Sequence, residues 1–174
     1  MEDNKKIKIQ IKSVFGDVLF AYEKENNTIK DTIEEAIKQD ANLGGAYLRD
    51  ANLRDANLTG AENIPYIPLS CPSDGAFIGW KKIKNCLIKL EIPEDAKRSS
   101  ATTRKCRCDK AKVLDITHLT TNEPITEVTN TSYSPEITYK VGEMVYPDEF
   151  DDNRWEECSN GIHFFINKQD AINY

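Results

Sequence analysis

The sequence lacks the features that mark membrane and secreted proteins. No run of apolar residues approaches the roughly 20 that a helix needs to cross a bilayer. The charged start, Met1–Lys6, is followed by alternating charge rather than by the apolar segment of a signal peptide. Hydrophobic residues make up 39% of the 174 residues, enough for one packed core but too few for several. We therefore expect a cytoplasmic protein of one domain, or of a small domain with an appendage, without contact with a membrane.

The chain also lacks an excess of positive charge and the cysteine pattern of a disulfide framework. The formal net charge of −6 argues against direct binding of duplex nucleic acid. Five cysteines are an odd number, so reduced thiols are expected. The cysteines are Cys71, Cys86, Cys106, Cys108 and Cys158. Cys106 and Cys108 could form a zinc site with another cysteine or His163, but the paired C-x-x-C spacing is absent. Buried, unreactive thiols are expected instead, with neither a metal nor a cofactor.

Three elements are predicted before residue 41. Ile7–Ile11 alternate apolar and polar residues and predict a half-buried strand, and Val18–Tyr22 predict the returning strand of a hairpin. One of the pair Asn27-Thr28 can cap a helix that continues to about Gln39. The first predicted region, residues 1–40, is therefore a β-hairpin followed by a helix.

Residues 41–60 repeat every five residues. The four copies are Ala41–Gly45, Ala46–Asp50, Ala51–Asp55 and Ala56–Gly60. A period of five matches neither 3.6 nor 2, so an ordinary helix or strand cannot place every leucine on one face. A square coil can, with the alanine and leucine of each copy pointing inward and polar residues at the corners. The competing interpretation is a continued helix, which Gly44-Gly45 and the repeated Asn-Leu pairs disfavour.

This five-residue pattern resembles the pentapeptide-repeat family, whose consensus alternates a small residue and a leucine in the same way. The resemblance implies about one turn of right-handed quadrilateral β-helix over residues 41–64. Repeat architectures bury their cores between neighbouring turns and need caps at both ends. We therefore expect the preceding helix and the following domain to cap this coil, which is too short to imitate duplex DNA.

A β-rich domain is predicted over residues 65–174, after a proline-containing linker. Apolar alternation and β-branched residues predict five strands in it. These strands cover Ala76–Trp80, Cys86–Ile92, Lys105–Ile116, Ile137–Val141 and Ile162–Phe165. Loops are expected at Lys97–Lys105 and Thr120–Ser134, and Asn167 should cap a short terminal helix. The whole chain is therefore assigned to the α+β class.

Charge is distributed unevenly along the second half of the chain. Residues 81–112 hold eleven basic and four acidic residues, a surplus of +7, whereas residues 113–174 hold twelve acidic and three basic residues, which gives −9. One interpretation is that the two segments are neighbours in space and neutralise each other. The other is an anion-binding cleft, since residues 97–105 mix guanidinium groups with hydroxyl side chains, a combination that suits phosphate.

The anion-binding hypothesis assigns nine residues to a basic cleft. Arginine supplies forked donors, Ser and Thr add hydroxyl donors, and a tryptophan beside two lysines can stack a base. The candidate ligand-binding residues are Trp80, Lys82, Arg98, Ser99, Thr102, Arg104, Lys105, Arg107 and His163. The expected ligand is a small phosphate-bearing, nucleotide-like molecule. A solvated basic loop is the alternative, because the glycines of a phosphate-binding loop are absent.

No catalytic residue is assigned. Cys158 with His163 is the obvious nucleophile–base pair, but no group that would orient them and no oxyanion hole is recognisable. A histidine that hydrogen-bonds within a sheet is the favoured interpretation of His163. A Cys/His-dependent enzyme therefore ranks third among the functions considered.

The C-terminal half resembles a domain of unknown function found behind short pentapeptide repeats in phage and prophage proteins. The segments that carry the resemblance are Gly79–Lys82, Ile92–Arg98, Arg104–Arg107 and Cys158–Phe165. The resemblance implies a viral or mobile-element setting in a host cytoplasm. It brings no activity, although small phage proteins of this kind often act against host defences by binding.

These observations together predict a non-enzymatic binding protein that captures a phosphate-bearing ligand in the basic cleft. The runner-up is a protein-interaction inhibitor that binds a host protein through the acidic segment Asp148–Asp152. A homo-oligomer is compatible with either function.

Overall fold

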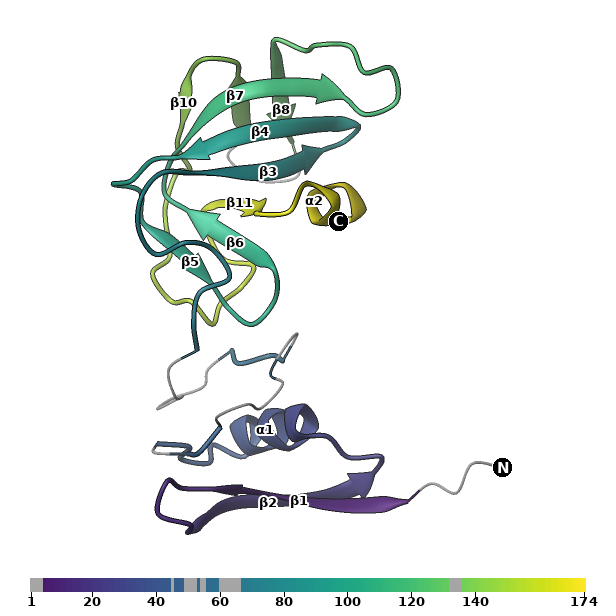
Figure 1. Cartoon of the computed structure of the whole chain (residues 1–174), viewed down its shortest axis with the longest axis vertical. Helices are drawn as coiled ribbons and strands as arrows, with labels where there is room; N and C mark the ends of the chain where they lie inside the picture. Colours follow the sequence, from purple (N-terminus) through teal and green to yellow (C-terminus); the bar gives the residue numbers. More distant parts are fainter. Residues whose placement is uncertain (1–4, 45, 49–52, 54–55, 60–66, 132–135) are drawn as a thin grey trace. The chain divides into compact units, whose positions relative to one another are not determined.

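The computed structural model describes residues 5–44, 46–48, 53, 56–59, 67–131 and 136–174. The chain divides into two compact units, unit 1 (Met1–Pro68) and unit 2 (Leu69–Tyr174) (Figure 1). Strands predominate and two helices are present, so the predicted α+β class is confirmed. Within the described residues, neither helix is long and apolar enough to span a membrane.

Unit 1 begins with the predicted hairpin and helix. Strands β1 (Lys6–Lys12) and β2 (Val18–Glu25) pair antiparallel, and α1 (Ile29–Lys38) follows them. Thr28 is the N-cap of α1, and it exchanges hydrogen bonds with Asp31 in a capping box, which satisfies backbone N–H groups that the first helical turn leaves unpaired. The predicted strand, returning strand and capped helix are therefore confirmed.

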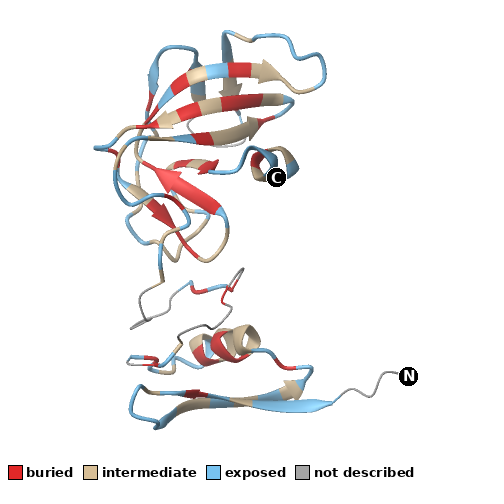
Figure 2. Ribbon diagram, in the orientation of Figure 1, coloured by how far each residue is buried: buried red, intermediate tan, exposed pale blue. Residues whose placement is uncertain are grey.

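Most small and leucine positions of the five-residue repeats are buried where the structure describes them (Figure 2). Ala46 and Ala56 are buried, as are Leu43, Leu53 and Leu58, whereas Ala41 and Leu48 are half-buried. Asparagine side chains form turns between these buried positions. The side-chain oxygens of Asn42 and Asn57 each accept a hydrogen bond from the backbone N–H two residues later. Residues 45, 49–52, 54–55 and 60–64 of the predicted quadrilateral β-helix lie outside the described residues, and the coil stays a prediction.

Unit 2 is built on a seven-stranded antiparallel sheet in the order β10-β7-β4-β3-β11-β6-β5, with a separate β8-β9 hairpin and a terminal helix (Figure 1). Its elements are β3 (Phe77–Ile83), β4 (Cys86–Ile92), β5 (Arg98–Ser100), β6 (Lys105–Cys108), β7 (Ala111–His118), β8 (Glu127–Asn130), β9 (Ile137–Lys140), β10 (Met144–Val145), β11 (Ile162–Phe165) and α2 (Lys168–Asn173). Asn167 caps α2 as predicted, because its side chain accepts a hydrogen bond from the Gln169 backbone.

Three sequence-based expectations are corrected by this topology. The single strand expected at Lys105–Ile116 is two strands, because Asp109 turns away to bond the backbone of Lys97 and β7 then joins the other half of the sheet. The loop expected at Lys97–Lys105 contains β5, which pairs with β6 although its residues show no apolar alternation. The loop expected at Thr120–Ser134 contains β8, held to β9 in part by a hydroxyl contact between Thr129 and Thr138; residues 132–134 lie outside the described residues.

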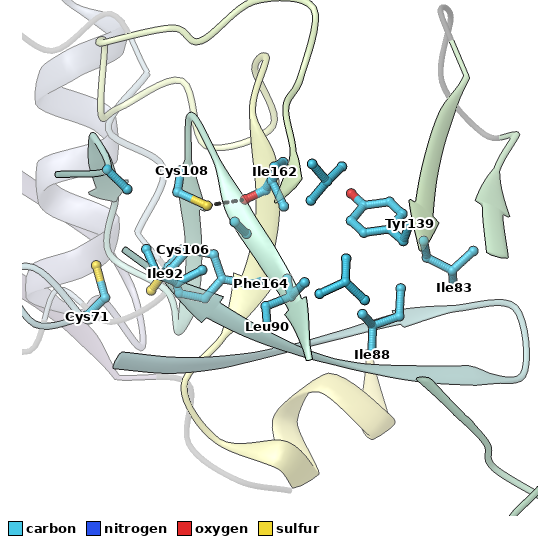
Figure 3. Close-up of a cluster of buried hydrophobic side chains, with 14 of the residues drawn as sticks. Cys71, Ile83, Ile88, Leu90, Ile92, Cys106, Cys108, Tyr139, Ile162 and Phe164 are labelled. Carbon is cyan, nitrogen blue, oxygen red and sulfur yellow. Dashed lines mark hydrogen bonds between the residues drawn. The ribbon is translucent and has the colours of Figure 1, made fainter. Parts of the chain in front are cut away.

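The main core of unit 2 covers one face of the sheet. Alternate residues of β4 point into it, and Tyr139 of the β8-β9 hairpin is buried among them (Figure 3). The opposite face is covered by α2, where Ala171 packs with Leu87 and Phe165. Gly79 of β3 faces the main core, and the ring of Phe164 lies so close that a Cβ at residue 79 would be 2.7 Å from it.

Candidate functional site

The sheet of unit 2 splits between β3 and β11. Strand β3 pairs with β4 along its whole length, but in the described residues it pairs with β11 only through Trp80 and Phe165. From that point β11 follows β6 instead, as far as the pair Ile162–Cys108. The two strands therefore separate beyond one residue pair, and the end of β3 is left without a strand on that side among the described residues.

Lys81 bridges the split. Its ammonium nitrogen Nζ donates a hydrogen bond to the backbone oxygen of His163, 3.0 Å away across the gap. The same ammonium lies 5.8 Å from the centre of the Tyr139 ring. Burial lowers the pKa of Lys81 from 10.5 to about 8, because an ammonium loses hydration between the two strands. Lys81 therefore stays largely charged at neutral pH, although its surroundings disfavour that charge.

Two adjoining hollows open at the split and share Lys81, Asn130 and His163. The larger hollow has a volume of about 240 Å³, and its walls also carry Lys82, Lys84, Phe165 and Tyr174. The smaller has a volume of about 100 Å³, and its walls include Asp148 and Cys158. Among the described residues, the side chains around the larger hollow include three lysines and no carboxylate. Its charge and its aromatic walls suit a small anion.

His163 contributes geometry rather than charge. Its ring nitrogen Nε2 donates to the backbone oxygen of Ser159 at a distance of 2.9 Å, since a carbonyl oxygen can only accept. The pKa of His163 is lowered from 6.5 to about 4, chiefly by burial, with a smaller contribution from the cations of Lys81, Lys105 and Arg107. The imidazole is therefore neutral at neutral pH, and it fixes the loop before β11 beside the hollow.

Comparison with known families identifies the domain that contains this split. Residues 67–171, more than half of the chain, match the model of a family of unknown function, DUF5758. The chain belongs to the DUF5758 family. Residues 39–62 match pentapeptide repeats, described as eight copies, so the resemblance of the repeat region is confirmed. No curated protein and no solved structure gives a significant match. The β3-β11 split lies within the matched residues, as do the residues that line both hollows apart from Tyr174.

The DUF5758 domain does not bring the three predicted arginines together. Arg98 donates to the backbone oxygens of five residues in two loops, and its guanidinium lies 5.1 Å from the ring of Phe77. The acceptors of Arg98 are the carbonyls of Pro72, Gly75, Pro93, Glu94 and Ala96, at 2.7 to 3.4 Å. Arg104 forms an ion pair with Asp170 of α2, at 2.8 Å. These two guanidinium groups hold different segments of the domain to the sheet.

Arg107 is fully enclosed. The residue is 3% exposed, and its guanidinium donates to the backbone oxygens of Asp151, Asn153 and Glu156. The guanidinium also lies 5.8 Å from the centre of the Phe150 ring. Arg107 therefore organises the segment around residues 150–156, and its hydrogen bonds are made with the chain itself.

The remaining predicted residues divide between the split and the fold. Lys82 and His163 line the larger hollow, and Lys82 also donates to the Ile172 backbone oxygen at 2.7 Å. Trp80 packs against the α2 side of the sheet, with the ammonium of Lys168 at 5.2 Å from its ring centre. The others lie away from the hollow: Ser99 and Lys105 are buried in β5 and β6, and Thr102 is half-buried between them.

The acidic segment expected to contact a partner is folded against basic residues of the same domain. Asp152 forms an ion pair with Lys97 at 3.3 Å, and Asp151 accepts a hydrogen bond from Arg107 through its backbone oxygen. These contacts agree with the interpretation in which the basic and acidic segments are neighbours in space. Asp148 is exposed and lines the smaller hollow.

Sequence reasoning did not assign Lys81, Lys84, Asn130 or Tyr174 to the site. One signal was present, because Lys81 alternates in phase with Gly79 and Ile83, and both of these neighbours are buried. A lysine on the buried side of a strand is unusual and needs an acceptor or a counter-charge. The other residues reach the hollow through tertiary structure alone.

Proposed function

We propose that the DUF5758 domain is a non-enzymatic binding module that captures a small phosphate-bearing ligand in the larger hollow of the split. The observation that carries this proposal is Lys81, a half-buried lysine that lines the hollow and whose ammonium has a single hydrogen-bond acceptor, the His163 carbonyl, in the described residues. An ammonium has three donors. An anion there would accept from the remaining donors and offset the loss of hydration.

The dimensions and charge of the hollow support a small ligand. Sites for drug-sized ligands usually have volumes of about 300–1,000 Å³, so a hollow of about 240 Å³ fits a phosphate group with one modest substituent. Lys82 and Lys84 add positive charge, and the rings of Phe165 and Tyr174 offer surfaces for a planar group. We therefore propose a nucleotide-like ligand rather than a large one.

The biological setting of this proposal rests on the resemblance to phage and prophage proteins. In that setting the protein would act in the cytoplasm of a host cell, and removal of a phosphate-bearing signal would oppose a host defence. The pentapeptide repeats would serve as a structural connection between the hairpin and the DUF5758 domain.

Binding is tested with the wild-type protein, Lys81→Met and Lys112→Met. Lys112 is an exposed lysine on β7 outside both hollows, so its variant controls for the loss of one charge. The probes are inorganic phosphate, nucleoside monophosphates and cyclic mononucleotides, measured by calorimetric titration and thermal shift. A ligand at a hundredfold excess over its Kd should stabilise the wild type by about 2.7 kcal/mol.

Lys81→Met should weaken binding by about ten- to a hundredfold, because a charge-assisted hydrogen bond contributes roughly 1.5–3 kcal/mol. Lys112→Met should bind like the wild type. The ligand-free Lys81→Met protein should fold, since the substitution removes a charge that burial disfavours. The proposal fails if no probe shifts the wild type, or if both variants lose affinity equally.

A further inference from the structure

A second reactive pair lies beside the smaller hollow, outside the lysines of the proposed site. The thiol sulfur of Cys158 lies 3.1 Å from Nζ of Lys105. Cys158 is exposed and lines that hollow, whereas Lys105 on β6 is 6% exposed. A nucleophilic sulfur that solvent reaches is therefore in contact with an amine that is almost fully enclosed.

No carboxylate forms an ion pair with Lys105 among the described residues. Its other contacts are with Tyr174, whose hydroxyl oxygen is 3.5 Å from Nζ and whose ring centre is 5.5 Å away. The carboxylate of Glu157 acts on Lys105 through its charge without forming an ion pair with it. The sulfur of Cys158 is in direct contact with the ammonium of Lys105, and it is exposed to an oxidant in solution.

The other four cysteines differ from Cys158 in exposure. Cys71, Cys106 and Cys108 are buried, and Cys86 is half-buried. A hydrogen bond with Cys71 together with burial raises the pKa of Cys106, and burial raises that of Cys108. An oxidant in solution therefore meets Cys158 first, and the neighbour of the oxidised sulfur is the Lys105 amine.

We propose that Cys158 and Lys105 form an oxidative modification site, in which hydrogen peroxide oxidises the thiol and the lysine amine then closes a sulfur–nitrogen bond. In the first step the thiolate attacks one peroxide oxygen, the O–O bond breaks, and sulfenic acid and water are formed after proton uptake. In the second step the neutral amine attacks that sulfur, the S–O bond breaks, and water leaves. The net change is one peroxide consumed, two waters released and two hydrogens lost from the protein.

Oxidation itself prepares the amine for the second step. Burial is the largest influence on Lys105 and by itself would lower its pKa, but contacts with Cys158, Tyr174 and Glu157 reverse it and raise the pKa overall. Sulfenic acid is neutral at neutral pH, so its formation removes the contribution of Cys158. The enclosed ammonium then releases its proton more easily, which supplies the nucleophile.

The test oxidises the full-length protein with hydrogen peroxide and maps its peptides by mass spectrometry. The expected product joins the Cys158 peptide to the Lys105 peptide with a loss of two hydrogens, and excess dithiothreitol should reverse it. Cys158→Ser should give no joined product, whereas Cys86→Ser should give it in the wild-type amount. This readout uses the wild type first, so it does not depend on whether a variant folds.

Two substitutions at Lys105 test the role of its amine. Lys105→Arg keeps a cation beside the sulfur but lacks the amine nucleophile, so Cys158 should stop at sulfenic acid and be trapped by dimedone. Lys105→Met, with its fold checked by circular dichroism, should likewise give no joined product, because it also lacks the amine. Wild-type protein that gives only sulfinic acid at Cys158, or a joined product that persists in Lys105→Arg, would overturn the proposal. Either result is distinct from a failure of phosphate binding, which does not require Cys158.

Discussion

Lys81 owes its properties to its place in the alternation of β3. Gly79 and Ile83 lie on the same side of the strand and are buried, so the lysine stem is carried into the protein with them. Its charge reaches a carbonyl only because β11 ends its pairing with β3 at Phe165. One residue therefore couples the sequence pattern, the split of the sheet and the proposed anion site.

The affinity for an anion should fall as the pH rises through about 8. The pKa of Lys81 in the ligand-free protein is about 8, so its ammonium is present below that pH and is lost above it. An orthophosphate monoester already carries its full charge there, since its second pKa is about 6. The apparent association constant should decrease by up to about tenfold per pH unit above 8, measured by calorimetric titration. Lys81→Arg, which does not titrate in this range, should give a much flatter profile; a wild-type profile equally flat would contradict the role of Lys81.

Gly79→Ala should destabilise unit 2. The new Cβ would lie 2.7 Å from Cδ2 and 3.2 Å from Cγ of Phe164, a ring that is itself fully buried. Overpacking of this kind costs about 1–3 kcal/mol, to be measured by urea unfolding followed through tryptophan fluorescence. The double variant Gly79→Ala with Phe164→Leu should lose less stability than the sum of the losses of the two single variants, because the smaller side chain relieves the clash. Additive losses would mean that the contact is not responsible.

At the scale of the element, α1 is tied to the hairpin by Asp31. Lys24 of β2 donates to its carboxylate at 2.7 Å, and Thr28 donates to it as well. These hydrogen bonds, with that from Lys24 the strongest influence, lower the pKa of Asp31 from 3.8 to about 2. The lowered pKa stabilises the folded state above pH 4, and that stabilisation should be lost as the pH falls from about 4 to 2. Asp31→Asn should remove this part of the pH dependence of the melting temperature, and an unchanged profile would contradict the assignment.

The repeat region should tolerate charge according to its five-residue pattern. Leu58 is 1% exposed, so Leu58→Asp would bury an unpaired carboxylate and should abolish folding of unit 1. Tyr47, the second residue of the copy that begins at Ala46, is 57% exposed, and Tyr47→Asp should change stability by less than about 0.5 kcal/mol. Far-UV circular dichroism is the measurement, because both tryptophans lie in unit 2 and do not report on unit 1. Equal effects of the two substitutions would exclude an inward-facing leucine position.

The elements that sequence predicted are those in which burial follows a regular period. Apolar residues alternate with polar ones along part of β4, and the alternate apolar residues are buried. Leu43 and Leu58 hold the same position in two copies of the five-residue repeat, and both are buried, so the sequence pattern and the burial agree. Strands β5 and β8 were missed because they are short and polar, and pairing rather than apolar burial defines them. The arginine cleft was inferred from residue types alone, whereas the acceptors of Arg98 and Arg107 are backbone oxygens of loops distant in the sequence. The split depends on where two strands part, and no local pattern encodes that position.

At the scale of the whole molecule, the net charge and the local charge have opposite signs. The chain carries −6 overall, yet the described side chains around the larger hollow include three lysines and no carboxylate. A small anion can therefore bind locally, while an extended polyanion meets a repulsive surface. Duplex DNA should show no binding by fluorescence anisotropy at physiological salt, under conditions in which a small phosphate ligand binds. Tight binding of duplex DNA that weakens steeply with salt would contradict the expectation that only a small anion binds.

The parting of β3 and β11 also has a mechanical consequence. Two halves of a sheet that share one rung, Trp80 with Phe165, can rotate about it without breaking a ladder of backbone hydrogen bonds. Such a rotation would break the hydrogen bond from Lys81 to the His163 carbonyl and disturb the packing of Phe164 on Gly79, while α2, which packs on both strands, limits the movement on its own face. Where the two backbones part, the sheet is therefore held together by side chains, with the Lys81 ammonium and the Phe164 ring spanning the gap in place of backbone hydrogen bonds.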